Sequence, residues 1–522
     1  MYTFSSRLKT FAFVLMVLGI LGVGYSFFTA PKTIEDVEKI VAEQDAHGHH
    51  GDAHAAPSHD AHGSAKEDHQ SEAHAVPAKP ADTAHAVAVD SAHKTTDSVH
   101  TEAAVAAGHE GHDHDAHVGH DHTADAHAHE GHDHTAHAEG AHGHDDAHAA
   151  HDEHHHHMEH MLHQLQNKPW SAVYVAALFF MLISLGALAF YAIQNAASAG
   201  WSPVLFRVME AISAYLIPGA IIVYVLLVLG VLDMHHIFIW MDKDVVAHDH
   251  LIQAKSGYLN KTFFLIRAAI FMGGWILYRQ YARKNSLAQD ESNDNSYYKK
   301  NFKGSATFLV FFIITESIMS WDWIMSVDPH WYSTLFGWYV FASFFVSGIT
   351  TIAMITLYLK SKGYLEYVNT SHIHDLAKFM FGISVFWTYL WFSQFMLIWY
   401  ADIPEEVTYF KTRIEDYNLP FFGMVAMNFV FPVLILINTD FKRLSWIVVT
   451  AGTVILAGHY IDFFNMIMPA TVGDQWFIGA GEIGAILFFM GLFILVVFTA
   501  LTKAPLLAKR NPLIEESKHF HY

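Results

Sequence analysis

The chain has 522 residues and a formal net charge of −21, and 52% of its residues are hydrophobic. This acidic balance gives no indication of nucleic acid binding, which needs basic surface. Because the chain contains no cysteine, it cannot ligate an iron–sulfur cluster through thiolates, attach haem c covalently or form a disulfide.

Ten apolar stretches hold most of the hydrophobic residues. Each is long enough to cross the roughly 30 Å hydrocarbon layer of a bilayer as a helix. The predicted fold class is therefore an all-α integral membrane protein with about ten transmembrane helices. The predicted spans are residues 8–29, 169–194, 203–232, 262–283, 304–326, 332–359, 376–400, 419–438, 444–469 and 478–502.

The first stretch also resembles a signal peptide, because Arg7 and Lys9 precede its apolar part. That part is about 19 residues long, which exceeds the apolar region of a typical signal peptide, and a weak cleavage site follows it. We therefore expect a retained helix. The predicted domains are a first transmembrane helix (1–31), a His-rich insert (32–165), a nine-helix membrane domain (166–505) and a cytoplasmic tail (506–522).

The insert is a low-complexity segment rich in His, Ala, Asp and Gly. Its apolar content is too low to support a packed core, so we expect disorder over residues 45–163. Three interpretations stay open: a solvated spacer, weak binding of Zn, Ni or Cu by imidazoles, and a response to acidic pH. The run His154, His155, His156 and His157 is an example of such a metal-binding candidate.

Basic and acidic residues fall on opposite sets of loops. One set carries Arg7, Lys9, Arg279, Arg283, Lys284, Lys299, Lys300, Lys303, Lys360, Lys362, Lys442, Arg443, Lys503, Lys509 and Arg510. The other set carries Asp402, Glu405, Glu406, Glu415, Asp416 and Asp474. By the positive-inside rule, both termini are expected in the cytoplasm and the insert on the periplasmic side.

The segment from Glu316 to Trp331 combines an acid inside a span with polar and aromatic residues at the exit of that span. Helical rise places Glu316 near the membrane midplane, where an isolated acid is usually functional. Asp322, Asp328 and His330 follow towards the outer surface. The tryptophans beside them, Trp321, Trp323 and Trp331, are typical of a membrane–water interface.

Further polar residues lie inside other spans. His459 and Asp462 are three residues apart on one helix face, in the outer half of span nine. Both residues suit a proton path. For His459, a packing role inside the bundle is the alternative interpretation. Gln394, Asn428 and Asn465 are more typical of interhelical hydrogen bonds than of ligand sites.

Two pairs of opposite charges also fall within the spans. Arg207 and Glu210 lie near the inner end of span three, where they suit an interfacial ion pair or a lipid-headgroup anchor. Arg267 and Glu482 enter their spans at similar outer depth, so a structural salt bridge between them is one interpretation.

The acids and the histidine form a sparse ladder across the membrane. The proton-path candidates are Glu210, Glu316, His459 and Asp462. The outer-side candidates for a quinone contact or a subunit interface are Arg267, Asp322, Asp328, His330 and Glu482. No catalytic residue is predicted, and we predict no metal site in the membrane domain.

The spans lack the ligands of common membrane cofactors. Bis-histidine haem needs paired histidines, but only His459 lies well inside a span. No P-loop motif occurs in the sequence. We therefore predict that the chain binds no prosthetic group of its own.

The string Ser320-Trp-Asp-Trp-Ile-Met-Ser-Val-Asp-Pro-His-Trp-Tyr-Ser-Thr334 resembles one from the membrane subunits of Alternative Complex III, a bacterial quinol:cytochrome c oxidoreductase. That complex has two related ten-span subunits of the NrfD/PsrC type. This chain is similar to the second, the ActF type, from about Pro169 to Pro505 and over the first span. The His-rich insert departs from the family pattern.

The resemblance implies two four-helix bundles, spans 2–5 and 6–9, flanked by spans 1 and 10. It implies a respiratory electron-transport role in a bacterial inner membrane, with quinone contact, proton translocation, or both. It also implies partners: an NrfD-like sister subunit, an iron–sulfur subunit, multihaem and monohaem cytochromes c, lipids and quinol. Haem c and the clusters would belong to those partners. In that family the quinol site lies in the sister subunit.

Two other function classes stay open. A metal-ion transporter with a His-rich outer loop would place several His, Asp or Glu residues at the midplane, often near broken helices; here the midplane holds essentially Glu316 alone. In a purely structural membrane subunit, the buried charges would only pair with their neighbours.

Overall fold

The computed structural model describes residues 1–47 and 145–521, and all regular elements in these ranges are helices. The α-helices are α1 (Ser6–Thr29), α2 (Ile34–His47), α3 (Asp145–Ala196), α4 (Phe206–Ile212), α5 (Leu216–Val231), α6 (Lys243–His248), α7 (His250–Lys255), α8 (Lys261–Glu291), α9 (Ser296–Trp323), α10 (Leu335–Ser361), α11 (Thr370–Ala401), α12 (Pro404–Glu415), α13 (Asn418–Val425), α14 (Phe431–Leu436), α15 (Ser445–Val472), α16 (Ala480–Leu501) and α17 (Ile514–Lys518). Short helical turns are η1 (Pro203–Leu205), η2 (Ser213–Tyr215), η3 (Ile239–Met241), η4 (Met325–Val327), η5 (Ala426–Val430) and η6 (Phe441–Arg443).

Within the described residues, ten helical segments are long and apolar enough to cross a membrane. This confirms the predicted fold class and the predicted number of spans. Span three is continuous from Pro203 to Val231 but is assembled from η1, α4, η2 and α5. Span eight, Asn418–Leu436, contains the π-helical turn η5 between α13 and α14. The chain is therefore a multi-pass membrane protein.

The insert prediction is wrong at both of its edges. Helix α2 occupies the start of the segment 32–165, and α3 begins at Asp145, so residues 145–163 are helical rather than disordered. Val37 of α2 packs against Met158 and Leu165 of α3. The apolar residues of α2 recur at helical spacing and give it a face to bury. The rest of the insert, residues 48–144, lies outside the described residues.

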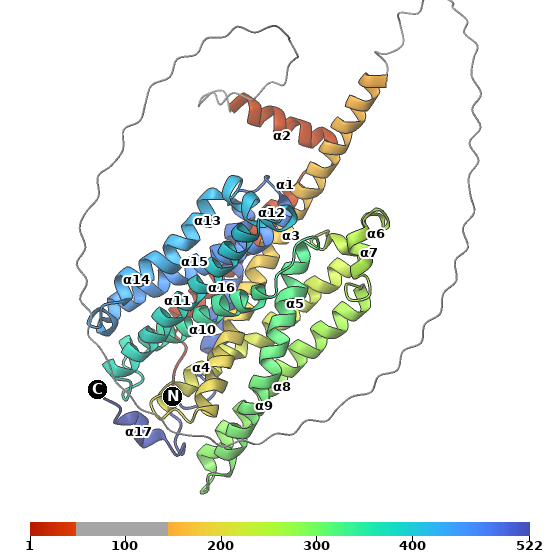
Figure 1. Cartoon of the computed structure of the whole chain (residues 1–522). Helices are drawn as coiled ribbons and strands as arrows, with labels where there is room; N and C mark the ends of the chain where they lie inside the picture. The colour runs from red at the N-terminus through yellow and green to blue at the C-terminus, as the bar shows by residue number, and fades with distance from the viewer. Residues whose placement is uncertain (48–144, 522) are drawn as a thin grey trace, which may run out of the picture. The chain divides into compact units, whose positions relative to one another are not determined.

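The spans can be grouped into two bundles and a flanking pair (Figure 1), with α8 packed on α5 and α9, and with α10 packed on α11 and α15. The first bundle contains α3, α4–α5, α8 and α9, and the second contains α10, α11, α13–α14 and α15. Helix α1 packs along α16. The grouping matches the arrangement expected from the resemblance. The bundles meet where α9 contacts α10 and where α3 crosses α10.

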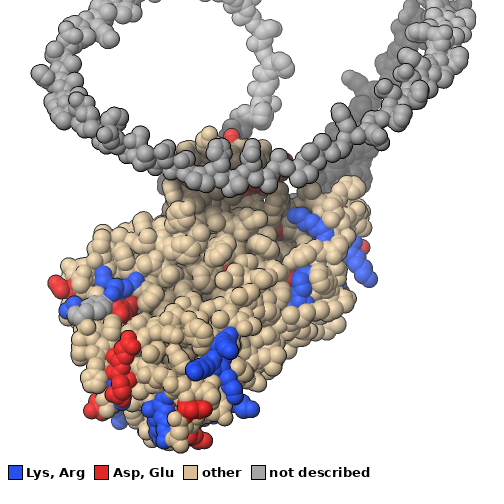
Figure 2. Space-filling view, turned by 60° about the horizontal axis from the view of Figure 1, so that its bottom comes forward, with Lys and Arg blue, Asp and Glu red and all other residues tan. Residues whose placement is uncertain are grey.

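Both ends of the chain lie at the same end of the helical body (Figure 1). Thr3 Oγ1 lies 3.2 Å from the Tyr364 hydroxyl, and Ser517 Oγ donates to the carbonyl of Trp201 at 2.7 Å. In Figure 2, which brings this end forward, Lys and Arg gather in patches with Asp and Glu, and most of the remaining surface is uncharged. This distribution is the one expected of a membrane protein whose charges lie outside the hydrocarbon layer.

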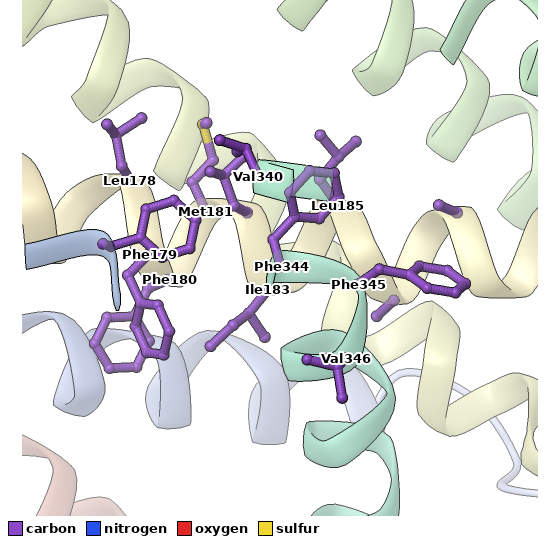
Figure 3. Packing of buried hydrophobic residues seen from close by; sticks show 14 of the residues in the cluster. Leu178, Phe179, Phe180, Met181, Ile183, Leu185, Val340, Phe344, Phe345 and Val346 are labelled. Atoms are coloured by element: carbon purple, nitrogen blue, oxygen red, sulfur yellow. The ribbon is translucent and has the colours of Figure 1, made fainter. Parts of the chain in front are cut away.

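Helices α3 and α10 form the centre of the structure. An 18-residue stretch of α3 is 94% buried, against 17% for α1, which lies at the periphery. Aromatic and branched residues of the two helices interlock where they cross, among them Phe179 and Phe344 (Figure 3). Glycines allow the close crossing: a Cβ atom on Gly186 would lie 2.5 Å from the Phe344 carbonyl oxygen.

Helix α1 is held to α16 by small residues. Cβ atoms added to Gly19, Gly22 or Gly484 would each collide with the backbone of the facing helix; at Gly484 the nearest atom, the Val23 nitrogen, would be 2.7 Å away. Such small-residue contacts let two membrane helices approach until their backbones touch. They attach the first span to the rest of the membrane domain.

We predict that Gly19→Ala loosens this helix pair. The new methyl group meets backbone that cannot rotate away, so the free energy of unfolding should fall by about 1–3 kcal/mol. Gly24→Ala is the matched control, because nothing lies within 4 Å of a Cβ at that position. Unfolding in mixed micelles, followed by tryptophan fluorescence, measures both variants. Equal unfolding midpoints would contradict the packing described.

Candidate functional site in the membrane bundles

A cluster of hydrogen-bonded side chains lies inside the second bundle, around Asp462 of α15. The Asp462 carboxylate accepts from Ser343 Oγ of α10 at 2.8 Å, from Trp387 Nε1 of α11 at 2.8 Å and from the Tyr339 hydroxyl of α10. His459 and Asp462 are fully buried. We call Tyr339, Ser343, Trp387, His459 and Asp462 the Asp462 cluster.

His459 joins this cluster through Ser343. Its Nδ1 atom lies 2.9 Å from Ser343 Oγ and 3.4 Å from Asp462 Oδ2. Because Ser343 Oγ donates its proton to Asp462, Nδ1 donates to Ser343 Oγ in the tautomer that carries the imidazole proton there. The result is a short chain of hydrogen bonds from His459 through Ser343 to Asp462. His459 Nε2 is buried without a hydrogen-bond partner among the described residues.

The π-helical turn η5 brings a further polar group to His459. Pro432 lacks an N–H, and its ring would collide with the carbonyl group of residue 428 in a regular α-helix, so the turn widens. Asn428 then lies with its Nδ2 atom 3.4 Å from His459 Nδ1. A side chain at Gly458 would collide with the Asn428 amide. Asn428, which was expected to form an interhelical hydrogen bond, thus lies directly beside the cluster.

Hydroxyl groups continue from the cluster along α10. Ser347 Oγ donates to the Ser343 carbonyl at 2.7 Å, and Thr351 Oγ1 donates to the Ser347 carbonyl at 2.8 Å. Spacing by four residues puts them on one face, over about 12 Å of helix. The hydroxyls of Thr350 in α10 and Ser384 in α11 are also buried, with no partner among the described residues. The sequence interpretation missed this stripe, although its i, i+4 spacing was visible.

Arg413 of α12 lies near the Tyr339 end of the cluster. Its Nε atom donates to the Asn465 carbonyl at 3.0 Å, and its guanidinium lies 3.4 Å from the centre of the Tyr409 ring. Tyr409 in turn stacks on Trp331, with 4.0 Å between ring centres. A small cavity between Arg413, Tyr339 and Gln394 separates this cation from the cluster. Arg413 was not among the predicted site residues.

Arg267 pairs with Asp322, so the suggested salt bridge between Arg267 and Glu482 is wrong. Arg267 Nε and Nη2 donate to the two Asp322 oxygens at 2.6 and 3.0 Å, and the Asp322 side chain is fully buried. Similar depth did not imply contact, because α8 packs against α9 rather than against α16. The pair is a bidentate link within the first bundle.

The tryptophans of the 316–331 segment pack inside the protein. Trp323 and Trp331 are 0% and 4% exposed, so the interpretation that they form a membrane-interface belt is wrong for these two. The Tyr174 hydroxyl donates to the Trp323 carbonyl at 2.8 Å, and Trp240 Nε1 donates to Ser326 Oγ at 3.2 Å. The segment connects α3, α9 and the loop after α5.

Asp328 and His330 lie on the surface rather than in a buried site. His330 Nε2 is 2.5 Å from Asp249 Oδ2, and its backbone N–H donates to Asp328 Oδ1 at 3.2 Å. The backbone N–H of Ile252 and the His330 ring hold the pKa of Asp249 below its usual range. These residues suit an interface with solvent or another subunit more than a proton path through the membrane.

Arg207 and Glu210 form the predicted ion pair, at 2.9 Å, within a larger cluster. Arg283 also donates to Glu210, and Arg207 donates to Asp290 at 2.5 Å. The Tyr191 hydroxyl donates to the other Glu210 oxygen at 3.3 Å. Because Arg207 is only 2% exposed, it is not available as a lipid-headgroup anchor.

Glu316 is the least supported of the buried acids. Ser317 Oγ donates to its Oε1 atom at 2.8 Å, while Oε2 is buried without a partner among the described residues. No hydrogen bond between described residues joins Glu316 to Glu210 or to the Asp462 cluster. The four predicted proton-path residues therefore do not form a connected ladder. Among these four residues, only His459 and Asp462 are in contact.

Glu482 lines a pocket of about 650 Å³ between α1, α3, α16 and the loop before α16. Its Oε2 atom accepts from the Gly479 N–H at 2.9 Å, which caps α16. Its Oε1 atom is buried with no partner within the described chain. Lys168, which is 6% exposed, lines the same pocket and lies over the Phe477 ring. Lys168 was missed because it begins an apolar stretch.

In the described part of the chain, no three His, Asp or Glu side chains gather closely enough to hold a metal ion. The side chains of His154, His155, His156 and His157 lie outside the described residues. Comparison with protein-family models and with curated proteins gave no match. The chemistry of the site therefore has to be argued from its own geometry.

We predict that breaking the Arg267–Asp322 pair destabilises the protein more than replacing it. Arg267→Met leaves a buried carboxylate unpaired, which should cost about 3–5 kcal/mol of unfolding free energy. The double variant Arg267→Met/Asp322→Leu removes both charges and should recover most of that loss. Unfolding in mixed micelles measures the single and the double variant. A double variant as unstable as the single one would contradict the pairing.

Proposed function

We propose that this chain is a membrane subunit of a quinol:cytochrome c oxidoreductase of the Alternative Complex III type, in a bacterial inner membrane, and that its second bundle carries protons. The observation that supports this most is the Asp462 cluster. Two titratable side chains, His459 and Asp462, lie fully buried between spans and are joined through a hydroxyl. Intramembrane ionisable groups of this kind are typical of proton relays.

The cluster has the chemistry that proton transfer needs. Ser343 can accept a proton from His459 Nδ1 while donating its own to Asp462, so one proton can move along the chain without either residue changing position. The α10 hydroxyls extend from the cluster towards the end of α10 that carries Lys360. Tyr339 and Arg413 lie on the opposite side. The proposed path therefore runs lengthwise through the second bundle.

The proposed quinol contact is the pocket at Glu482. A quinol offers hydroxyl donors, and the unpartnered Glu482 oxygen is an acceptor for one of them. Tyr25, Trp476 and Phe477 supply aromatic walls, which suit a flat apolar ring. Lys168 provides a second polar group at the same pocket. In this proposal, quinol is a substrate of the complex rather than a resident cofactor of the chain.

The proposal also assigns electron carriers to partner subunits. The chain has no cysteine, and His459 has no second histidine among its contacts in the described residues. The expected partners are the NrfD-like sister subunit, an iron–sulfur subunit, and multihaem and monohaem cytochromes c. Under the positive-inside rule, the end of the protein with both termini faces the cytoplasm and the insert enters the periplasm.

Purification of the native complex tests this assignment. Extracted in mild detergent, the chain is expected to migrate on a native gel with haem-staining polypeptides and a protein that contains an iron–sulfur cluster. Peptide mass spectrometry of the band identifies the subunits, and quinol-driven reduction of cytochrome c measures the activity. Isolation as a stable lone oligomer that transports zinc would overturn the proposal.

We predict that Asp462→Asn leaves the complex assembled but lowers quinol-driven proton release at least about tenfold. The amide fills the same space but cannot take up the transferred proton, and proton transfer by a positioned side chain typically contributes at least a hundredfold in rate. Glu316→Gln, in α9 of the first bundle, should lower release as well if the path extends beyond the second bundle. Native gels check assembly, and proteoliposomes report turnover and proton release.

Glu405→Gln is the matched control, since it makes the same chemical change at an exposed position of α12. It should retain wild-type values. An assembled Asp462→Asn complex with wild-type proton release would remove the second bundle from the path. An assembled Glu316→Gln complex with wild-type release would confine the path to the second bundle.

A further inference from the structure

A second pocket, of about 530 Å³, lies between α4–α5, α8 and α16 at the end of the protein that holds both termini. Arg279 and Arg283 of α8 and Lys503, just after α16, line one part of it. Ile217, Pro218 and Val496 form an apolar wall, and all three are half-buried. The pocket thus joins a cationic region to an apolar trough.

The positive charge of this pocket is incompletely balanced. Its one carboxylate, Glu210, already accepts from Arg207 at 2.9 Å, from Tyr191 at 3.3 Å and from Arg283. Within the described chain, no hydrogen bond or ion pair involves the side chain of Arg279 or Lys503, and Arg279 Nε is buried without a partner. Three cations against one carboxylate leave a net charge of two positive.

The depth of these cations suits the headgroup layer of a bilayer. About 20 helical residues cross the hydrocarbon. Twenty residues counted from Lys261, at the start of α8, end between Arg279 and Arg283. These two arginines lie one turn apart on one helix face. Lys503 follows the last residue of α16, Leu501. Three donors thus reach the same level from two spans.

We infer that this pocket binds the phosphodiester headgroup of an anionic phospholipid. Arg279 and Lys503 contact the phosphate with their free donors, and Arg283 adds charge while it holds Glu210. One acyl chain lies along the trough between α5 and α16. Charge complementarity selects this occupant, because the phosphodiester of an anionic lipid lowers the excess from two positive charges to one, whereas a zwitterionic lipid or a neutral quinol brings no net negative charge. The site is distinct from the Asp462 cluster and from the Glu482 pocket.

The test uses the purified full-length chain, delipidated in detergent, and two lipids with identical dioleoyl chains, phosphatidylglycerol and phosphatidylcholine. Native mass spectrometry counts bound lipid during a titration. Wild-type protein should bind phosphatidylglycerol at least about tenfold more tightly than phosphatidylcholine. Arg279→Gln/Lys503→Gln should weaken phosphatidylglycerol binding about thirtyfold, since each cation near a membrane surface contributes about fivefold.

Lys299→Gln/Lys303→Gln is the matched control. It removes the same charge from exposed positions of α9 at the same end of the protein, and its affinity should stay within about twofold of wild type. If the double variant of the pocket does not fold, Lys503→Gln alone, at an exposed position, should still lose about fivefold. Equal losses in control and pocket variants would overturn the proposal. So would equal binding of both lipids, or displacement of phosphatidylglycerol by millimolar inorganic phosphate, which would indicate a free-anion site.

Discussion

The absence of water in the hydrocarbon layer is the constraint on which this structure depends. A polar side chain inside a span has to find its partner within the protein, on its own helix or on another one, because lipid offers none. Two bundles meet this requirement in different ways. The first pairs opposite charges, as in Arg267 with Asp322. The second surrounds the Asp462 carboxylate with two hydroxyls and an indole N–H. Helix packing in both bundles is therefore tied to side-chain chemistry.

This difference separates structural charges from candidate functional ones. Neutralising one member of the Arg267–Asp322 pair would leave the other charge buried and unpaired, so that pair is suited to stability rather than to proton exchange. The Asp462 cluster contains no cation in direct contact with the carboxylate, and its hydroxyls can reverse their donor and acceptor roles. A proton can thus enter or leave this cluster with only a local rearrangement. In the proposed function, stability and proton transfer are divided between neighbouring bundles.

The sequence was sufficient to predict the spans, the buried acids and the local Arg207–Glu210 pair, but not the partners that come from other helices. Apolar stretches of membrane length define helices directly, whereas a partner depends on how each helix is rotated about its axis. Arg267 and Glu482 share a depth but face different neighbours, which is why the predicted pair was wrong. Ser343 was missed because hydroxyl residues are common in spans and carry no charge. Trp323 and Trp331 are buried, so they face protein rather than lipid.

The 316–331 segment connects the two bundles and explains why so many unusual residues occur together. In its first half, the Asp322 carboxylate pairs with Arg267. The Asp322 backbone carbonyl accepts from Ser326 Oγ, and Ser326 Oγ accepts from Trp240 Nε1. At its end, Trp331 stacks on Tyr409, whose ring lies against Arg413 beside the Asp462 cluster. A shift of the segment would therefore move a cation near the cluster. The segment's aromatic residues thus help to position Arg413 near the Asp462 cluster.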